Sequence, residues 1–257
     1  MSHQDQDPHR KEIIDQFSRQ AIPFTQVPGH RDALQVLLEL SGVGPVDTVL
    51  DVACGPGMVA CEFARHAGRV TGIDLTPAMI DQAKKRQQEQ GLENLIWKVA
   101  DAVPLPYADD SFSLVITRYS FHHLLDPSAA LREMIRVCRP GGRVLVADVA
   151  VEAEKAADYD RLEILRDPSH THALTREEFD GLFQESGLQE CRRSAYGVTI
   201  ELEAQLRASF PKPGDKAVVR QMIICDIGID GLGINARREG EQVVYTVPVA
   251  VYVGSKG

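Results

Sequence analysis

A glycine turn is the first feature of the sequence whose residue types could do chemistry. An apolar run from Val49 ends in Gly55 and Gly57, and with Ala60 the spacing has the form G-x-G-x-x-A before a helical pattern begins. Glycines let a ligand approach the backbone closely, and a helix start offers unpaired N–H groups. The turn therefore predicts a nucleotide-containing cofactor, with NAD and S-adenosylmethionine as the alternatives.

Three acidic residues bear on these alternatives, and two of them, Asp51 and Asp101, separate the two cofactors. Asp51 lies inside the first predicted strand, where its charge would repel a pyrophosphate and suits a cofactor with a cationic ammonium group. Asp74 ends the second strand and can accept hydrogen bonds from both ribose hydroxyls of either cofactor. Asp101 ends the third strand, where a carboxylate can accept from an adenine amino group. The set favours S-adenosylmethionine.

Alternating strands and helices must position these residues. The apolar pattern predicts strands over 48–53, 69–73, 94–100, 112–117 and 143–149, and helices over 57–66, 77–90 and 127–138. Such alternation is typical of a parallel sheet with helices on both faces. A sheet of this kind binds ligands beyond the carboxyl ends of its strands, where the glycine turn and the acids lie.

The two ends of the chain differ from this pattern. Residues 1–12 look irregular, and a helix is expected from Glu12 to about Gln20. Later, Thr175 and Glu178 form a capping box, and Pro248 is expected to begin the last strand. We expect three parts: a helical N-terminal cap over 1–45, a cofactor-binding α/β domain over 46–200 and 241–257, and a helical insert over 201–240 as candidate substrate lid.

Four stretches between residues 48 and 149 resemble one enzyme family: VLDVACGPG, VTGIDLTPAMI, VADAVPLPYADDSFSLVITRYSFHHLLDP and LREMIRVCRPGGRVLVADV. They are similar to class I S-adenosylmethionine-dependent methyltransferases, in particular the ubiquinone/menaquinone-biosynthesis group. The resemblance implies an α/β, doubly wound, mostly parallel seven-stranded sheet of Rossmann-like type, with an antiparallel last strand and a helical insert. It implies cofactor contacts at Asp51, Ala53, Gly55, Gly57, Asp74, Leu75, Met79, Asp101, Ala102 and Arg118. The match weakens after Val149.

Two pairs of histidines are candidates for chemistry. His122 and His123 follow the fourth strand, where the methyl group would point, and one of them could act as general base. The alternative is that they orient the loop or pack under it. His170 and His172 form an H-x-H without an evident third ligand, which favours a surface position over a metal site. No metal is expected.

Three further side chains near the expected site have two interpretations each. Phe17 and Phe24 either close over the cofactor or pack the N-terminal helix against the domain. Cys54 is interpreted as a small core residue rather than as a reactive thiol.

Composition limits the partners. The chain has 257 residues and a formal net charge of −9, which disfavours generic binding to nucleic acids and to anionic membrane surfaces. The polar N-terminus lacks the apolar segment of a secretory signal, and no apolar run is long enough for a membrane span. Five cysteines without C-x-x-C spacing argue against disulfides and a zinc cluster. We expect a cytoplasmic monomer or homodimer.

The expected reaction is methyl transfer from S-adenosylmethionine to a small-molecule acceptor, with carbon, nitrogen, oxygen and sulfur all open as the accepting atom. One alternative is a methyltransferase fold that binds the cofactor but catalyses another reaction or serves as a binding module, since fold alone does not decide function. The other is a nicotinamide-dependent oxidoreductase, which Asp51 disfavours.

Overall fold

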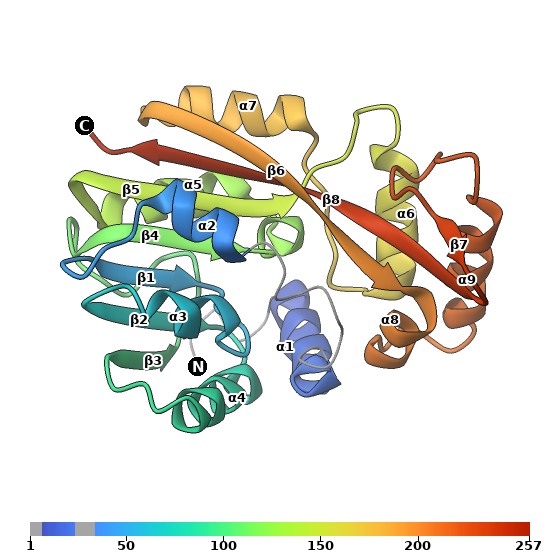
Figure 1. The fold of residues 1–257 in the computed structure, drawn as a ribbon, viewed down its shortest axis with the longest axis horizontal. Coiled ribbons are helices and arrows are strands. Elements are labelled where there is room, and N and C mark those ends of the chain that lie inside the picture. The colour runs from blue at the N-terminus through green and yellow to red at the C-terminus, as the bar shows by residue number, and fades with distance from the viewer. Residues whose placement is uncertain (1–6, 24–33) are drawn as a thin grey trace.

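The computed structural model describes residues 7–23 and 34–257, and one sheet forms its centre. The strands are β1 (Thr48–Val52), β2 (Arg69–Asp74), β3 (Leu95–Val99), β4 (Phe112–Arg118), β5 (Cys138–Val149), β6 (Gln189–Glu201), β7 (Arg237–Glu239) and β8 (Gln242–Ser255). They lie in the order β3-β2-β1-β4-β5-β8-β6, and β7 pairs with β8 (Figure 1). β1 to β5 pair in parallel, whereas β8 is antiparallel to both β5 and β6. The predicted sheet with an antiparallel last strand is confirmed.

Helices cover both faces of this sheet. They are α1 (Pro8–Gln20), α2 (Leu34–Ser41), α3 (Met58–Phe63), α4 (Pro77–Glu89), α5 (Pro127–Val137), α6 (Ala156–Arg166), α7 (Arg176–Glu185), α8 (Leu202–Ala208) and α9 (Asp215–Cys225), with the 3-10 turn η3 (Phe121–His123). Leu37 of α2 and Phe63 of α3 pack on one face, and Met134 of α5 and Phe179 of α7 on the other. The doubly wound arrangement is confirmed, as is the capping box that starts α7.

The N-terminal helix begins earlier than predicted. α1 starts at Pro8, because the Asp7 side chain accepts a hydrogen bond from the backbone amide of His9 at 3.0 Å and caps the helix. Proline at the first helical position needs no hydrogen-bond partner for its nitrogen. The expectation of irregular structure up to residue 12 is therefore wrong from Pro8 onward.

The last strand also begins earlier than predicted. β8 starts at Gln242, so Pro248 lies inside it, opposite Gly197 of β6. The Pro248 carbonyl accepts a hydrogen bond from Ala150, just beyond the last residue of β5. In an extended strand the N–H and C=O of one residue point to the same side, so the side without an N–H faces the place where β5 has ended. Proline is tolerated there because its missing N–H faces the end of β5, so it removes no bond from the pairing with β6.

β6 and β8 continue past the parallel strands, and α6, α8, α9 and β7 gather around this extension (Figure 1). α1 lies between the extension and the parallel strands. The segment 201–240 forms α8, α9 and β7, and its buried residues Leu206, Val219 and Ile223 belong to the same apolar cluster as Val49 of β1. The segment is therefore part of the packed core.

Candidate active site

A cavity of about 230 Å³ opens where the parallel strands end. It lies beyond the carboxyl ends of β1 to β5, as expected for a sheet of this kind. Two of the residues predicted to form the site, Asp51 and Gly57, are not among the residues that line it. The others line it: Ala53, Gly55, Asp74, Leu75, Met79, Asp101, Ala102, Arg118, His122 and His123.

The glycine turn forms one wall of the cavity. Gly55 has a φ of +51°, and a Cβ added there would meet nothing within 4 Å. Gly57 has a φ of +76°, and a Cβ there would lie 2.8 Å from the Trp97 ring. Both conformations favour glycine. Gly55 leaves the backbone open to a ligand, whereas Gly57 lets the turn pack on Trp97.

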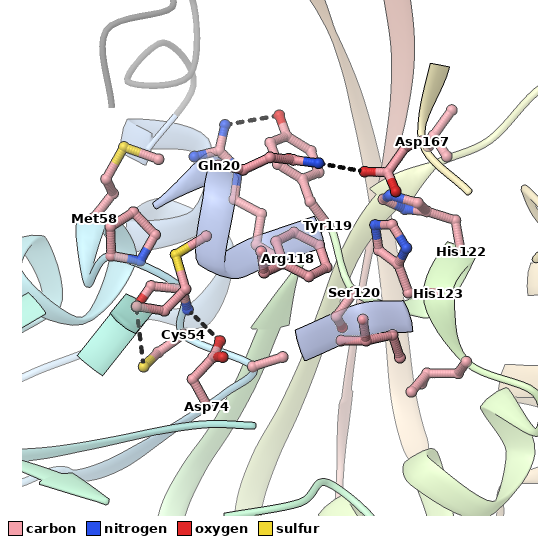
Figure 2. A pocket seen from close by; sticks show the side chains of 18 of the residues that line it. Gln20, Cys54, Met58, Asp74, Arg118, Tyr119, Ser120, His122, His123 and Asp167 are labelled. Atoms are coloured by element: carbon pink, nitrogen blue, oxygen red, sulfur yellow. Dashed lines mark hydrogen bonds between the residues drawn. The ribbon is translucent and has the colours of Figure 1, made fainter. Parts of the chain in front are cut away.

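Asp74 joins the turn to the next loop. Its Oδ2 accepts a hydrogen bond from the Gly55 amide at 2.8 Å (Figure 2), and its Oδ1 accepts from the Thr76 amide at 2.8 Å. Burial raises the pKa of this carboxyl group. Each oxygen retains a second lone pair for a ligand hydroxyl.

Asp51 is buried in β1 with an unsatisfied oxygen. Its side chain is 1% exposed, and Oδ2 has no hydrogen-bond partner among the described residues. Burial raises the pKa of Asp51 to about 8, and the neighbouring charge of Asp74 acts in the same direction. A buried carboxylate oxygen without a partner costs free energy, which a nearby cation would recover. The observation fits the ammonium group of S-adenosylmethionine.

The positively charged guanidinium of Arg118 lies at the same wall of the cavity. Its Nη2 donates to the Tyr119 hydroxyl at 2.7 Å and its Nε donates to the Tyr196 hydroxyl at 3.0 Å. Figure 2 shows the contact between Arg118 and Tyr119 at the cavity. Tyr119 follows β4 with a φ of +59°, a conformation that L side chains rarely adopt and that recurs at functional sites.

α1 closes the cavity from the N-terminal side. Arg10 forms an ion pair with Asp101, and His9 Nε2 donates to the His123 carbonyl at 2.7 Å. Gln20 Nε2 donates to Asp167 Oδ2 at 2.8 Å (Figure 2). The expected adenine contact, Asp101, therefore also holds the N-terminal helix.

Phe17 and Cys54 can now be placed. Phe17 of α1 lines the cavity, and its ring packs edge-on against His123 with the centroids 4.9 Å apart, so it both covers the cavity and packs the helix. Phe24 lies outside the described residues. Cys54 is buried, and burial raises the pKa of its thiol well above the usual value, as expected for a small core residue.

His122 and Asp148 form a hydrogen-bonded pair. His122 Nδ1 and Asp148 Oδ1 are 2.5 Å apart, and the same carboxylate accepts from the backbone amides of Phe121 and Val149. Burial lowers the pKa of His122, but the charge and hydrogen bond of Asp148 outweigh burial and raise it overall. Since Nδ1 faces the carboxylate, Nε2 is the ring nitrogen left for the cavity.

His123 has a different environment. Its ring lies 4.2 Å from the His122 ring, and its Nδ1 lies 3.0 Å from the Ser169 carbonyl, which can only accept. Burial lowers the pKa of His123 to about 3, and the neighbouring His122 acts in the same direction. His123 is therefore neutral throughout the physiological range and a poor proton acceptor.

The H-x-H pair is only partly as predicted. His170 is 5% exposed, and its Nε2 lies 2.7 Å from Asp160 Oδ1, so the expected surface position is wrong for this residue. His172 is half-exposed, and its Nδ1 lies 2.6 Å from Asp160 Oδ2. Across residues 7–23 and 34–257, no group of three or more histidine, cysteine or acidic side chains is arranged to hold a metal ion.

The sequence patterns did not identify several residues that line the cavity. Tyr159, Glu163 and Arg166 of α6 all line it, and their spacing of four and then three residues places them on one helix face. Arg166 binds Glu163 through two nitrogens, with Nε 2.9 Å from Oε1 and Nη2 2.5 Å from Oε2. Asp148 could have been found from its place near the carboxyl end of a predicted strand.

With this geometry in place, comparisons with known proteins assign the family. The methyltransferase-domain family matches residues 50–146. The uncharacterized methyltransferase YcgJ of Bacillus subtilis is 28% identical over 212 residues, which are 81% of this chain and 84% of YcgJ. An uncharacterized protein of Mycobacterium tuberculosis is 30% identical over 210 residues, 72% of this chain and 74% of that protein. The ubiquinone/menaquinone biosynthesis C-methyltransferase UbiE of Bdellovibrio bacteriovorus is 40% identical over 114 residues, 44% of this chain and 48% of UbiE.

Comparison with solved structures indicates the same family as comparison with sequences. The crystal structure of YcgJ matches with a TM-score of 0.77 and 25% identity, over 88% of this chain and 99% of YcgJ. The chain belongs to the class I S-adenosylmethionine-dependent methyltransferases. Among the described residues, the helices are too short or too polar to cross a membrane.

Proposed function

We propose that the protein transfers the methyl group of S-adenosylmethionine to a small-molecule acceptor. The observation that carries the proposal is that Gly55 with Asp74, and His122 with Asp148 behind it, lie at one cavity, which Gly55, Asp74 and His122 line. A methyl donor held on one side would thus meet a proton acceptor on the other. The resemblance to UbiE, a C-methyltransferase of quinone biosynthesis, supports a small acceptor.

The residues on the β1–β3 side fit the cofactor. Asp51 would pair with its ammonium group, the Gly55 turn would lie along its methionine end, and Asp74 would accept from the ribose hydroxyls. Leu75 and Ala102, which both line the cavity, would enclose the adenine. The chemistry that this cofactor supplies is a methyl group on a sulfonium, which needs no metal for its activation.

His122 is the proposed general base. Its Nε2 has no hydrogen-bond partner in the described part of the chain, and its Nδ1 faces Asp148. His122 would take a proton from the accepting atom as that atom attacks, and Asp148 would stabilise the imidazolium that forms. The pKa of Asp148 is lowered, because the charge of His122 and three hydrogen bonds outweigh burial, so the carboxylate stays ionised for this role.

The insert 201–240 is proposed to cover the part of the cavity where the acceptor would bind, away from the glycine turn. This part of the cavity is called the acceptor side. α8 supplies Gln205 and Ala208 to the cavity wall, whereas α9 has no residue in it. Of the whole insert, α8 is therefore the part that is proposed to contact the acceptor. Gln205→Leu should change the KM for the acceptor and leave cofactor affinity unchanged. A shift in cofactor affinity as large as the shift in KM would contradict this division.

Calorimetry and product detection test the proposed function. S-adenosylhomocysteine should bind and NAD should not. Hydrogen bonds to a charged group contribute about 1.5–3 kcal/mol, so Asp74→Ala should weaken binding roughly 10- to 150-fold. With methyl-labelled S-adenosylmethionine and a pool of small metabolites, label should appear in a small molecule together with S-adenosylhomocysteine. Cofactor binding without labelled product would identify a binding module instead, and NAD binding would favour the oxidoreductase.

A further inference from the structure

Two buried tyrosines of the cavity have hydroxyls that make no hydrogen bond within residues 7–23 and 34–257. Tyr159 of α6 is 3% exposed and Tyr245 of β8 is 3% exposed, and both line the cavity. Neither hydroxyl has a hydrogen-bond partner among the described residues, although buried tyrosine hydroxyls usually find one. Burial raises the pKa of both, so each hydroxyl keeps its proton and can donate it to a ligand.

The two charged side chains beside these hydroxyls, Arg166 and Glu163, form an ion pair with each other. Arg166 lines the cavity next to them, but its guanidinium binds the Glu163 carboxylate through two nitrogens. Its Nη1 makes only a 3.4 Å contact to the Ser209 hydroxyl. A ligand carboxylate here would lie beside Glu163, and a ligand cation would lie beside Arg166. The surroundings therefore favour a ligand group without net charge.

The facing wall is apolar. Val198 and Ile200 of β6 lie opposite Val247 and Tyr245 of β8, and all four side chains line the cavity. Because side chains alternate across a strand, the two residues of each strand point to the same face. One continuous surface thus combines an aliphatic wall with the Tyr245 hydroxyl.

We propose that Tyr159 and Tyr245 bind a neutral hydrogen-bond-accepting oxygen of the acceptor, which is an uncharged and largely apolar molecule. That this ligand is the methyl acceptor rests on the proposed function. That a ligand oxygen binds here is inferred from the two hydroxyls alone. These tyrosines come from outside the cofactor side of the cavity, since the glycine turn, Asp74 and Asp101 follow β1, β2 and β3. They are specificity-determining residues, not general bases.

Three matched probes test the chemistry. Acetophenone carries an uncharged carbonyl, benzoate has the same ring with a negative charge, and isopropylbenzene has the same shape without oxygen. Their dissociation constants are measured by ligand-detected NMR on the full chain, with and without S-adenosylhomocysteine. Acetophenone should bind tightest. Tyr159→Phe and Tyr245→Phe should each weaken acetophenone about 2- to 10-fold and leave isopropylbenzene unchanged.

Tyr252→Phe is the matched control, because Tyr252 lies on β8 outside the cavity and donates to Asp180 at 2.8 Å. It should leave probe binding unchanged but lower Tm, since it loses a protein hydrogen bond. Tyr159→Phe and Tyr245→Phe should keep or raise Tm, since neither loses one. Acetophenone binding that is unchanged in both variants, or tighter binding of benzoate, would overturn the inference. S-adenosylhomocysteine binding, measured on the same samples, tests the proposed function separately.

Discussion

His122 Nδ1 and Asp148 Oδ1 lie 2.5 Å apart, although His122 belongs to η3, just after β4, and Asp148 lies 26 residues later, near the carboxyl end of β5. This contact distinguishes His122 from His123, its neighbour in the chain. One ring is bound to a carboxylate that can stabilise its charged form, and the other has a pKa lowered to about 3 by burial. Only the first can take up a proton near neutral pH.

The two histidines should therefore differ on substitution. His122→Gln should lower kcat roughly 10²- to 10⁴-fold, because the proton acceptor is lost. His123→Gln is the matched control and should reduce kcat far less. Cofactor affinity by calorimetry should stay near wild type in both. Equal losses of kcat in the two variants would contradict the assignment.

The pH dependence of kcat should depend on Asp148. His122 acts as a base only when unprotonated, so the rate should rise as pH passes its pKa, which Asp148 raises. Asp148→Asn removes that charge, so the rising part of the pH–rate profile should move to lower pH while the maximal rate falls. A profile that keeps its position would exclude His122 as the titrating group.

Gly55→Ala should separate stability from cofactor binding. Its φ of +51° strains alanine by roughly 1–2 kcal/mol, and the new methyl group would occupy the space beside the turn. Gly91→Ala is the matched control, with a φ of +63° and equally open surroundings after α4. Both variants should lose similar free energy of unfolding in denaturant titrations. Only Gly55→Ala should lose affinity for S-adenosylhomocysteine.

Asp51 should link cofactor binding to pH. Its pKa in the free protein is about 8, and a bound ammonium group would lower it. The affinity for S-adenosylmethionine should then rise with pH up to about 8, with proton release that calorimetry in buffers of different ionisation enthalpy detects. Asp51→Asn should bind more weakly and lose this pH dependence.

The substitution Asp51→Asn should also change how the stability of the fold depends on pH. Because the folded pKa of Asp51 is raised, the native state binds more protons than the unfolded state between about pH 4 and 8. The wild type therefore loses stability as pH rises through this range, and Asp51→Asn does not. The Tm of the variant relative to wild type should be higher at pH 8 than at pH 5. An equal Tm difference at both pH values would show that Asp51 is not the buried titrating group.

Most residues assigned to the cofactor from sequence patterns lie around one cavity, because the signals that point to them are local. The glycine turn, the acids that end strands and the alternation of strands and helices all depend on near neighbours. Gly55 and Asp74 meet in the structure as parallel pairing of β1 and β2 requires. Pro248 was misplaced because its tolerance depends on where β5 ends, which no local pattern contains.

The two tyrosines of the cavity were not predicted, because they come together with the other lining residues only in three dimensions. Tyr159 lies on α6 and Tyr245 on β8, more than 80 residues later in the chain. Similarly, the burial of His170 follows from the packing of α6 and η3, and the H-x-H spacing gives no sign of it. Of the acceptor side, only the polar face of α6 has helical spacing visible in the sequence.

The long strands β6 and β8 pair as a two-stranded ribbon that forms one wall of the cavity. Its inward positions, among them Val198, Ile200 and Val247, line the cavity, whereas Thr199 between Val198 and Ile200 is exposed. The family match ends at residue 146, before this ribbon begins. Replacing alternate residues of one two-stranded ribbon would thus retune substrate preference while the donor half keeps its sequence, which makes this ribbon the natural target for a directed library.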